Sequence, residues 1–158
     1  MNTLPSRRVF LRTTAAGLAL AAAPGRLMAQ GVKDKAVFAF VGCAHIHTPG
    51  FVNLLKERPD VTVKYVWDHQ NVRAEKRAAE LGAQVAKRLD VIWGDPHVDA
   101  VVICSETDRH PALVRAAAKA GKHMFVEKPL GFTSSESIAM ARDIEKAKLL
   151  FTTGYFMR

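Results

Sequence analysis

The sequence predicts an α/β fold in which a doubly wound parallel sheet of about six strands lies between two layers of helices. Three observations lead to this class. Short apolar runs alternate with helical patterns from residue 36 onward. The runs are continuously apolar, as in strands covered on both faces. Gly82 and Gly121 stand where two of the helical patterns stop.

The first strand is expected over Ala36–Val41. A short helix follows over Gly50–Arg58, because Pro59 cannot continue it. The residues expected on its apolar face are Phe51, Leu54 and Leu55.

The second strand is expected over Val61–Trp67, and a helix with small alanines on its packing face is expected over Asn71–Leu81. Gly82 would end this helix in the left-handed conformation. A weak third strand at Ala83–Ala86 and a helical turn over Arg88–Trp93 complete the first half.

The Val-Val-Ile run of Asp99–Cys104 predicts a fourth strand, followed by a helix over Arg109–Ala120. His123–Val126 is the fifth strand, and Leu149–Thr153 is the sixth. Between them a helix is expected to run to Lys148, capped by Ser134 or Ser135. Six strands with helical crossovers match the order 3-2-1-4-5-6 of a Rossmann-type sheet.

Residues 1–29 have the pattern of a twin-arginine signal peptide. Ser6–Arg12 is a charged segment with two adjacent arginines, and the apolar stretch Thr13–Ala23 follows. Cleavage is expected after Ala29, with residues 30–35 as a linker. The alternatives are a disordered basic tail or a start codon placed too early. Eleven apolar residues are too few for a stable membrane span, which takes about 20.

The basic charge of the chain lies largely in this leader, which holds four arginines and no acid. Without it the formal charge falls from +8 to +4. No stripe of lysine and arginine interleaved with aromatic residues suggests nucleic-acid binding. The remaining residues, 36–158, suffice for one domain.

The turn after the first strand, Gly42–His47, stands where a dinucleotide fingerprint G-x-G-x-x-G would lie, and it keeps only the first glycine. Its backbone N–H groups can still meet a phosphate. Asp68 ends the second strand, where an acid would accept hydrogen bonds from a ribose. The alternative is an ordinary acid at a strand end.

The fifth strand delivers Glu127, Lys128 and Pro129 at its exit. In open parallel sheets, ligands bind beyond the carboxyl ends of the strands. Pro129 holds Lys128 in extended backbone angles, so the lysine leaves the strand in a defined direction. The alternative is a solvated Lys-Pro turn.

The stretch Val98–Leu130, with V-D-A-V-V-I-C, His110 and A-G-K-H-M-F-V-E-K-P-L, resembles the N-terminal domain of the glucose-fructose oxidoreductase and inositol dehydrogenase family, Gfo/Idh/MocA. The resemblance extends from about Ala36 to Arg158. The chain departs from the family in the two missing glycines, and in having Glu106-Thr107 where members often have Pro-Asn.

The resemblance implies an NAD(P)-dependent enzyme that acts on sugars, cyclitols or related polyols, and it assigns roles residue by residue. The phosphate loop would be Gly42, Cys43, Ala44, His45, Ile46 and His47, and the ribose acceptor Asp68. The second cofactor edge would be Ser105, Glu106, Thr107 and His110, and Glu127 and Lys128 would stand beside the nicotinamide and substrate.

Lys128 is the expected catalytic residue, since an ammonium beside an alcohol under oxidation stabilises the developing alkoxide. Family members usually take the proton acceptor from a C-terminal substrate domain, which residues 1–158 do not contain. The chain is therefore expected to be the cofactor half of a longer protein or a truncated product. An NAD-dependent glycosidase and a non-catalytic nucleotide-binding module are the alternatives.

NAD is favoured over NADP because Asp68 would repel a 2′-phosphate, although Arg73, Lys76 and Arg77 could accept one. The leader adds the twin-arginine translocase as a partner during export and a periplasmic or other extracytoplasmic location. A homo-oligomer of the complete protein is left open.

His45-x-His47 raises the question of a metal, but no cysteine or carboxylate cluster accompanies these residues at zinc spacing, so no metal is predicted. Cys43 and Cys104 end strands that are neighbours in the predicted sheet. They form either a disulfide, which an oxidising periplasm would permit, or a pair of small buried residues under the cofactor.

Overall fold

The structure, a computed structural model, describes residues 35–155. The predicted leader, nearly all of the predicted linker and the last three residues lie outside this range.

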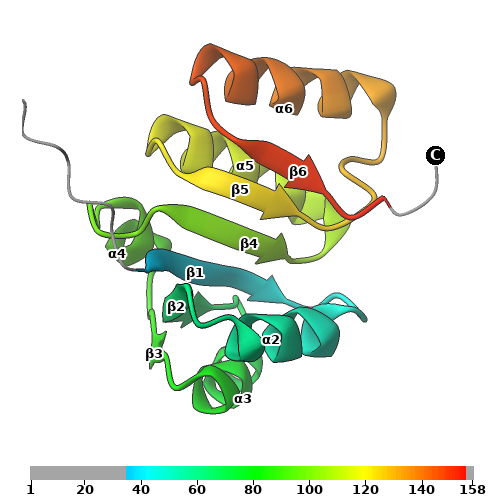
Figure 1. Cartoon of the computed structure of the whole chain (residues 1–158). Helices are drawn as coiled ribbons and strands as arrows, with labels where there is room; N and C mark the ends of the chain where they lie inside the picture. Colours follow the sequence, from blue (N-terminus) through cyan, green and yellow to red (C-terminus); the bar gives the residue numbers. More distant parts are fainter. Residues whose placement is uncertain (1–34, 156–158) are drawn as a thin grey trace, which may run out of the picture. The chain divides into compact units, whose positions relative to one another are not determined.

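Six parallel strands form one sheet in the order β3-β2-β1-β4-β5-β6 (Figure 1). The predicted fold class and strand order are therefore confirmed. The strands are β1 (Ala36–Cys43), β2 (Val61–Trp67), β3 (Gln84–Val85), β4 (Ala100–Cys104), β5 (His123–Val126) and β6 (Phe151–Thr153).

Helices cover both faces of the sheet, with α2 and α3 on one side and α5 and α6 on the other (Figure 1). Successive side chains of β1 divide between the two cores, since Val41 packs with the α5 and α6 side and Phe40 with the α2 and α3 side. The helices are α2 (Thr48–Glu57), α3 (Asn71–Leu81), α4 (Leu89–Trp93), α5 (His110–Lys119) and α6 (Ser134–Lys146), and a 3-10 turn, η1 (Thr107–Arg109), precedes α5.

The predicted apolar face of the first helix is wrong in one respect. The helix α2 begins at Thr48, two residues earlier than expected, and its buried residues are Thr48 and Val52. Leu54 is 54% exposed, whereas the ring of Phe51 contacts that of Phe125 with centroids 4.7 Å apart. The helix therefore lies on the sheet with a slightly rotated face.

The predicted cap of the last helix is also wrong. Thr133, and not Ser134 or Ser135, is the N-cap of α6. Its hydroxyl accepts a hydrogen bond from the Glu136 N–H (3.2 Å), and the Glu136 carboxylate accepts one from the Thr133 N–H (3.2 Å). This reciprocal capping box satisfies two donors that the helix itself leaves without partners.

The lysine of the Gly-Lys-His sequence holds the amino-terminal end of the sheet together. Lys122 is 5% exposed, and its ammonium donates to the carbonyl oxygens of Asp95 (2.6 Å) and Val98 (2.9 Å) just before β4. His123 Nδ1 accepts from the N–H of Leu150, just before β6. Both residues therefore act at the end of the sheet opposite to the carboxyl ends of its strands.

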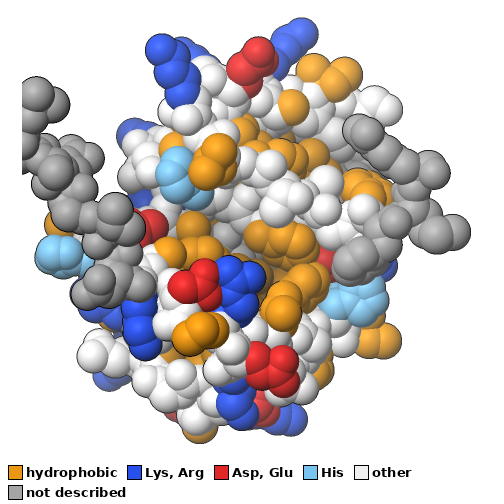
Figure 2. Space-filling view, viewed as in Figure 1, with side chains coloured by type: hydrophobic (Ala, Val, Ile, Leu, Met, Phe, Trp, Pro, Cys, Tyr) orange, Lys and Arg blue, Asp and Glu red, His pale blue; other side chains and the backbone are white. Residues whose placement is uncertain are grey.

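Toward β5 and β6, the face of the sheet opposite to α5 and α6 is only partly covered by a described helix (Figure 1). An open apolar hollow of about 440 Å³ lies there, with Phe38, Phe125 and Phe151 among its lining residues. Figure 2 shows hydrophobic side chains reaching the surface on this side. Among the described helices, none is long and apolar enough to span a membrane.

Candidate functional site

Four neighbouring strands bring the predicted site residues to the carboxyl end of the sheet. The phosphate loop Gly42–His47 begins in the last two residues of β1 and continues beyond it. Asp68 follows β2, Ser105 and Glu106 follow β4, and Glu127 and Lys128 follow β5. Since all strands are parallel and adjacent, these segments lie side by side. This is the position in which open α/β sheets bind ligands.

Gly42 fits a point where two loops touch. Its φ is +80°, and a Cβ added to it would lie 2.4 Å from the Cβ of Ser105 and 2.6 Å from its Cα. The His45 N–H also donates to the carbonyl oxygen of Cys104 (3.0 Å). The phosphate loop therefore rests directly on the end of β4, and only glycine permits this approach.

Asp68 binds protein donors with both carboxylate oxygens. Oδ2 accepts from the Cys43 N–H (2.6 Å), and Oδ1 accepts from the Gln70 N–H (2.7 Å) and from Arg73 Nε (3.0 Å). The side chain has no exposed surface. Asp68 thus ties the phosphate loop to the end of β2, and its contact with a ribose stays a prediction.

Arg73 links this acid to a second one. Its Nη2 donates to Glu106 Oε1 (2.8 Å), while the Ser105 hydroxyl donates to Glu106 Oε2 (3.1 Å). Partial burial raises the pKa of Glu106, but the hydrogen bonds from its own backbone N–H and from Arg73 outweigh that effect and lower the pKa. Glu106 is therefore an anionic group, 35% exposed, at the mouth of the site. Nothing in the sequence around Arg73 predicts that it joins Asp68 to Glu106.

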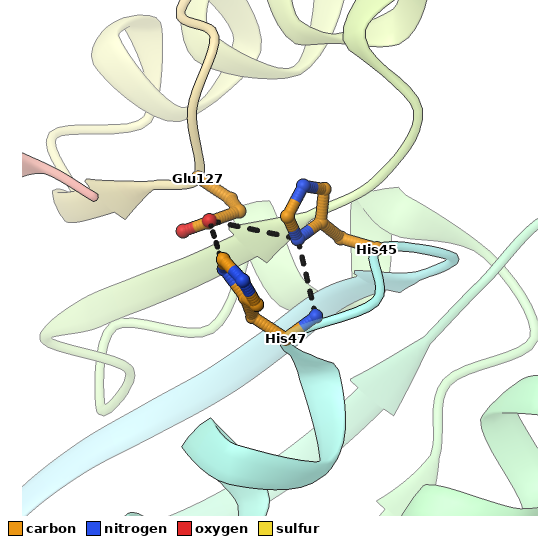
Figure 3. A group of neighbouring side chains, drawn as sticks. All are labelled: His45, His47 and Glu127. Carbon is orange, nitrogen blue, oxygen red and sulfur yellow. Dashed lines mark hydrogen bonds and ion pairs between the residues drawn. The ribbon is translucent and has the colours of Figure 1, made fainter. Parts of the chain in front are cut away.

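Glu127, His45 and His47 form a compact group, called here the His-Glu cluster (Figure 3). Glu127 is fully buried, and its Oε1 lies 2.7 Å from His47 Nδ1 and 3.5 Å from His45 Nδ1. The His47 N–H donates to His45 Nδ1 (3.3 Å). Burial lowers the pKa of His45, although the Glu127 carboxylate acts in the opposite direction.

The sequence has no cysteine or carboxylate cluster at zinc spacing beside the histidine pair, but the fold brings one carboxyl group to it. Glu127 lies 80 residues from His47 in the chain, and only the pairing of β1 with β4 and of β4 with β5 brings the two together. Glu127 Oε2 has no hydrogen-bond partner among the described residues. It lies against Gly154, where an added Cβ would be 2.2 Å away.

His110 supports the site from below. It is fully buried, with Nδ1 3.1 Å from the carbonyl oxygen of Pro129 and Nε2 3.2 Å from that of Ser105. It joins the loop after β4 to the loop that carries Lys128, so the structure gives it a positioning role beneath the second cofactor edge. Lys128 itself is half-buried, and the peptide bond to Pro129 is cis.

The remaining predicted residues differ in exposure. Ile46 is 81% exposed, Ala44 is half-buried, and Thr107 begins η1 at the edge of the site. Cys43 and Cys104 are register partners in β1 and β4, and both are buried free thiols. Burial raises the pKa of Cys43 to about 12 and raises that of Cys104 as well. The structure thus has the pair of small buried residues and not the disulfide.

A six-stranded Rossmann sheet with a phosphate loop after β1 and charged residues after β2, β4 and β5 defines an NAD(P)-binding domain. Residues 37–155 match the family model described as "Oxidoreductase family, NAD-binding Rossmann fold". The chain belongs to this family, Gfo/Idh/MocA.

Its relatives include inositol dehydrogenases. Myo-inositol 2-dehydrogenase of Thermotoga maritima is 35% identical over 119 residues, which cover 75% of this chain and 35% of the relative. Scyllo-inositol 2-dehydrogenase (NAD(+)) of Bacillus subtilis is 33% identical over 67% of this chain and 31% of its own length. The chain thus spans about a third of the length of these relatives.

A solved structure has the same fold at a similar level of identity. The crystal structure of an NAD-binding protein from Listeria innocua superposes with a TM-score of 0.68 and 28% identity. The match covers 75% of this chain and 35% of that one.

The contact between Gly42 and Ser105 predicts a large loss of stability for Gly42→Ala. The new methyl group meets backbone as well as side-chain atoms, and the positive φ adds strain, so the free energy of unfolding should fall by at least about 2 kcal/mol. Urea denaturation, monitored by circular dichroism, measures this change in the free energy of unfolding.

Gly50→Ala is the matched control, because Gly50 lies within α2 and a Cβ there meets nothing within 4 Å. It should leave stability unchanged or raise it by up to about 1 kcal/mol. Equal effects of the two substitutions would contradict the special role of Gly42.

Proposed function

We propose that this domain binds NAD at the carboxyl end of its sheet and serves as the cofactor half of an oxidoreductase. The enzyme would transfer a hydride between the nicotinamide and a hydroxyl group of a sugar or polyol. The observation that carries the proposal is the convergence of the phosphate loop, the Asp68–Arg73–Glu106 group and Glu127–Lys128 on four adjacent strands. The inositol dehydrogenases among the relatives support the substrate class.

The hydrogen bonds of the loop indicate which donors would meet the diphosphate. The N–H groups of Cys43, His45 and His47 bind Asp68, Cys104 and His45 respectively. Those of Ala44 and Ile46 have no partner among the described residues, and they lie just before the N-terminus of α2. Free N–H groups at a helix start favour a bound phosphate.

The charges beside Asp68 support NAD over NADP. Arg73 is already bound by Asp68 and Glu106, and Arg77 is bound by Glu80 (2.7 Å). The partly exposed Glu106 would lie near a 2′-phosphate and repel it. Two of the three basic side chains that sequence reasoning offered to NADP are thus engaged by carboxylates.

Glu106→Gln tests this preference, because it removes the repelling charge while keeping the shape. Isothermal titration with NAD and NADP should give tighter binding of NAD to the unmodified chain. The substitution should reduce the preference roughly threefold to tenfold, as expected for one partly screened charge.

Glu57→Gln is the control, since Glu57 is an exposed acid at the end of α2, away from the carboxyl end of the sheet. Tighter binding of NADP by the unmodified chain would contradict the assignment. Absence of binding of either nucleotide would overturn the proposed function itself.

Lys128 is proposed as the catalytic residue of this half-site. Its ammonium would hold the reacting hydroxyl and stabilise negative charge on the oxygen as hydride leaves the carbon. The Lys128→Ala change, made in a complete protein of this family with the same Glu-Lys-Pro sequence, should lower turnover by about 10²-fold or more with little change in NAD affinity.

Two measurements separate the outcomes of this experiment. Unchanged turnover would contradict the role of Lys128. Stoichiometric accumulation of NADH with substrate supports an oxidoreductase, whereas product formation without net redox change would indicate the NAD-dependent glycosidase.

Export by the twin-arginine pathway is proposed from residues 1–29 alone. Residues 1–35 fused to a folded fluorescent protein should carry it to the periplasm of a bacterial host. Replacement of Arg7 and Arg8 by lysine should retain it in the cytoplasm. Equal periplasmic amounts of both fusions, measured by fractionation, would refute this proposal.

A further inference from the structure

The His-Glu cluster contains a buried carboxyl group with few partners. Glu127 has no exposed surface, and its only hydrogen-bond donor among the described residues is the ring of His47. An ionised carboxylate taken out of water is costly unless it is paired or coordinates a metal. Among the described residues, the basic groups within 4 Å of its oxygens are the two imidazoles.

The directions of the hydrogen bonds do not fit an ion pair between His45 and Glu127. His45 Nδ1 accepts the N–H of His47, so this nitrogen carries no proton. It nevertheless faces Glu127 Oε1 at 3.5 Å, which places two acceptors next to each other. A cation bound by His45 Nδ1 in place of the His47 N–H, and shared with the carboxylate, would remove this conflict.

The spacing and the donor types suit a metal ion. One ligand atom from each of the three residues lies within 4.8 Å of the other two. Ligands of tetrahedral zinc at ordinary bond lengths are about 3.3 Å apart, close to the 3.5 Å between His45 Nδ1 and Glu127 Oε1. Around an ion, the 2.7 Å hydrogen bond between His47 Nδ1 and Glu127 Oε1 would lengthen, and the widest separation in the group, up to 4.8 Å, would shorten. Two imidazoles and one carboxylate form a known catalytic zinc set, and imidazole also suits iron, nickel and copper.

The loop holds its two histidines firmly. The His45 N–H donates to the Cys104 carbonyl oxygen (3.0 Å), and the His45 carbonyl oxygen accepts from the Thr48 N–H (3.0 Å). Glu127 is fixed by its own N–H, which donates to the Ile103 carbonyl oxygen (2.9 Å). The three side chains thus project from anchored backbone on two loops (Figure 3).

We propose that His45, His47 and Glu127 bind one divalent first-row transition metal ion, with zinc the best match to the donor set. The side chain of His47 is 41% exposed and that of His45 16%, so the cluster opens to solvent on the side of the histidines. The ion therefore has three protein ligands and one exchangeable position. That position faces the carboxyl end of the sheet, on which Lys128 also lies.

Zinc binding to the complete chain of 158 residues, made without a histidine tag and stripped with a chelator, tests this site. After dialysis against zinc, mass spectrometry of the metal should find one ion per chain. Isothermal titration with zinc should show a single site. His47→Gln and Glu127→Gln should each weaken it at least about tenfold.

His97→Gln is the matched control, because His97 is exposed and lies before β4 at the other end of the sheet. It should leave zinc binding unchanged. Cobalt in place of zinc gives a second readout, since its visible absorption should depend on His45 and not on His97.

Substoichiometric zinc, or binding that His97→Gln weakens as much as His47→Gln does, would overturn the proposal. If Glu127→Gln proves unfolded by circular dichroism, the partly exposed His47 still decides the outcome. The titrations contain no nucleotide, so a failure to bind zinc is distinct from a failure to bind NAD.

Discussion

The carboxyl end of the sheet depends on the close contact between β1 and β4. Gly42 lies against the backbone of Ser105, and the pairing of the two strands shifts by one residue at Gly42, so that Val41 pairs with Ile103 and Cys43 with Cys104. Any side chain at position 42 would push the phosphate loop away from the end of β4. Since His45 and His47 belong to that loop, their distance from Glu127 follows from the same contact.

Buried polar residues fix the neighbouring loops relative to the β1–β4 contact. Asp68 fastens the phosphate loop to β2, and His110 fastens the loop after β4 to the loop after β5. Each has most of its partners in the backbone, so each fixes the course of the chain and not merely the place of a side chain. Glu106 and Lys128 are only partly buried and lie where a ligand could reach them.

The sequence predicted the limits of helices and strands better than the contacts between residues that lie far apart in the chain. The strand Val61–Trp67 and the helix Asn71–Leu81 have the expected limits because apolar periodicity and Gly82 act within a few residues. The cap at Thr133 was missed because three neighbouring hydroxyl residues compete, and backbone angles decide between them. The His-Glu cluster was missed because its members approach only through the sheet, and no local pattern records that approach.

Gly154 gives the outermost strand an influence over this chemistry. It follows β6, three strands along the sheet from β1 and its phosphate loop, and its lack of a side chain leaves room for Glu127 Oε2. A shift of β6 by a fraction of an ångström would press on that oxygen and tilt the carboxylate toward or away from the two imidazoles. The position of the edge strand is therefore coupled to the orientation of the Glu127 carboxyl group.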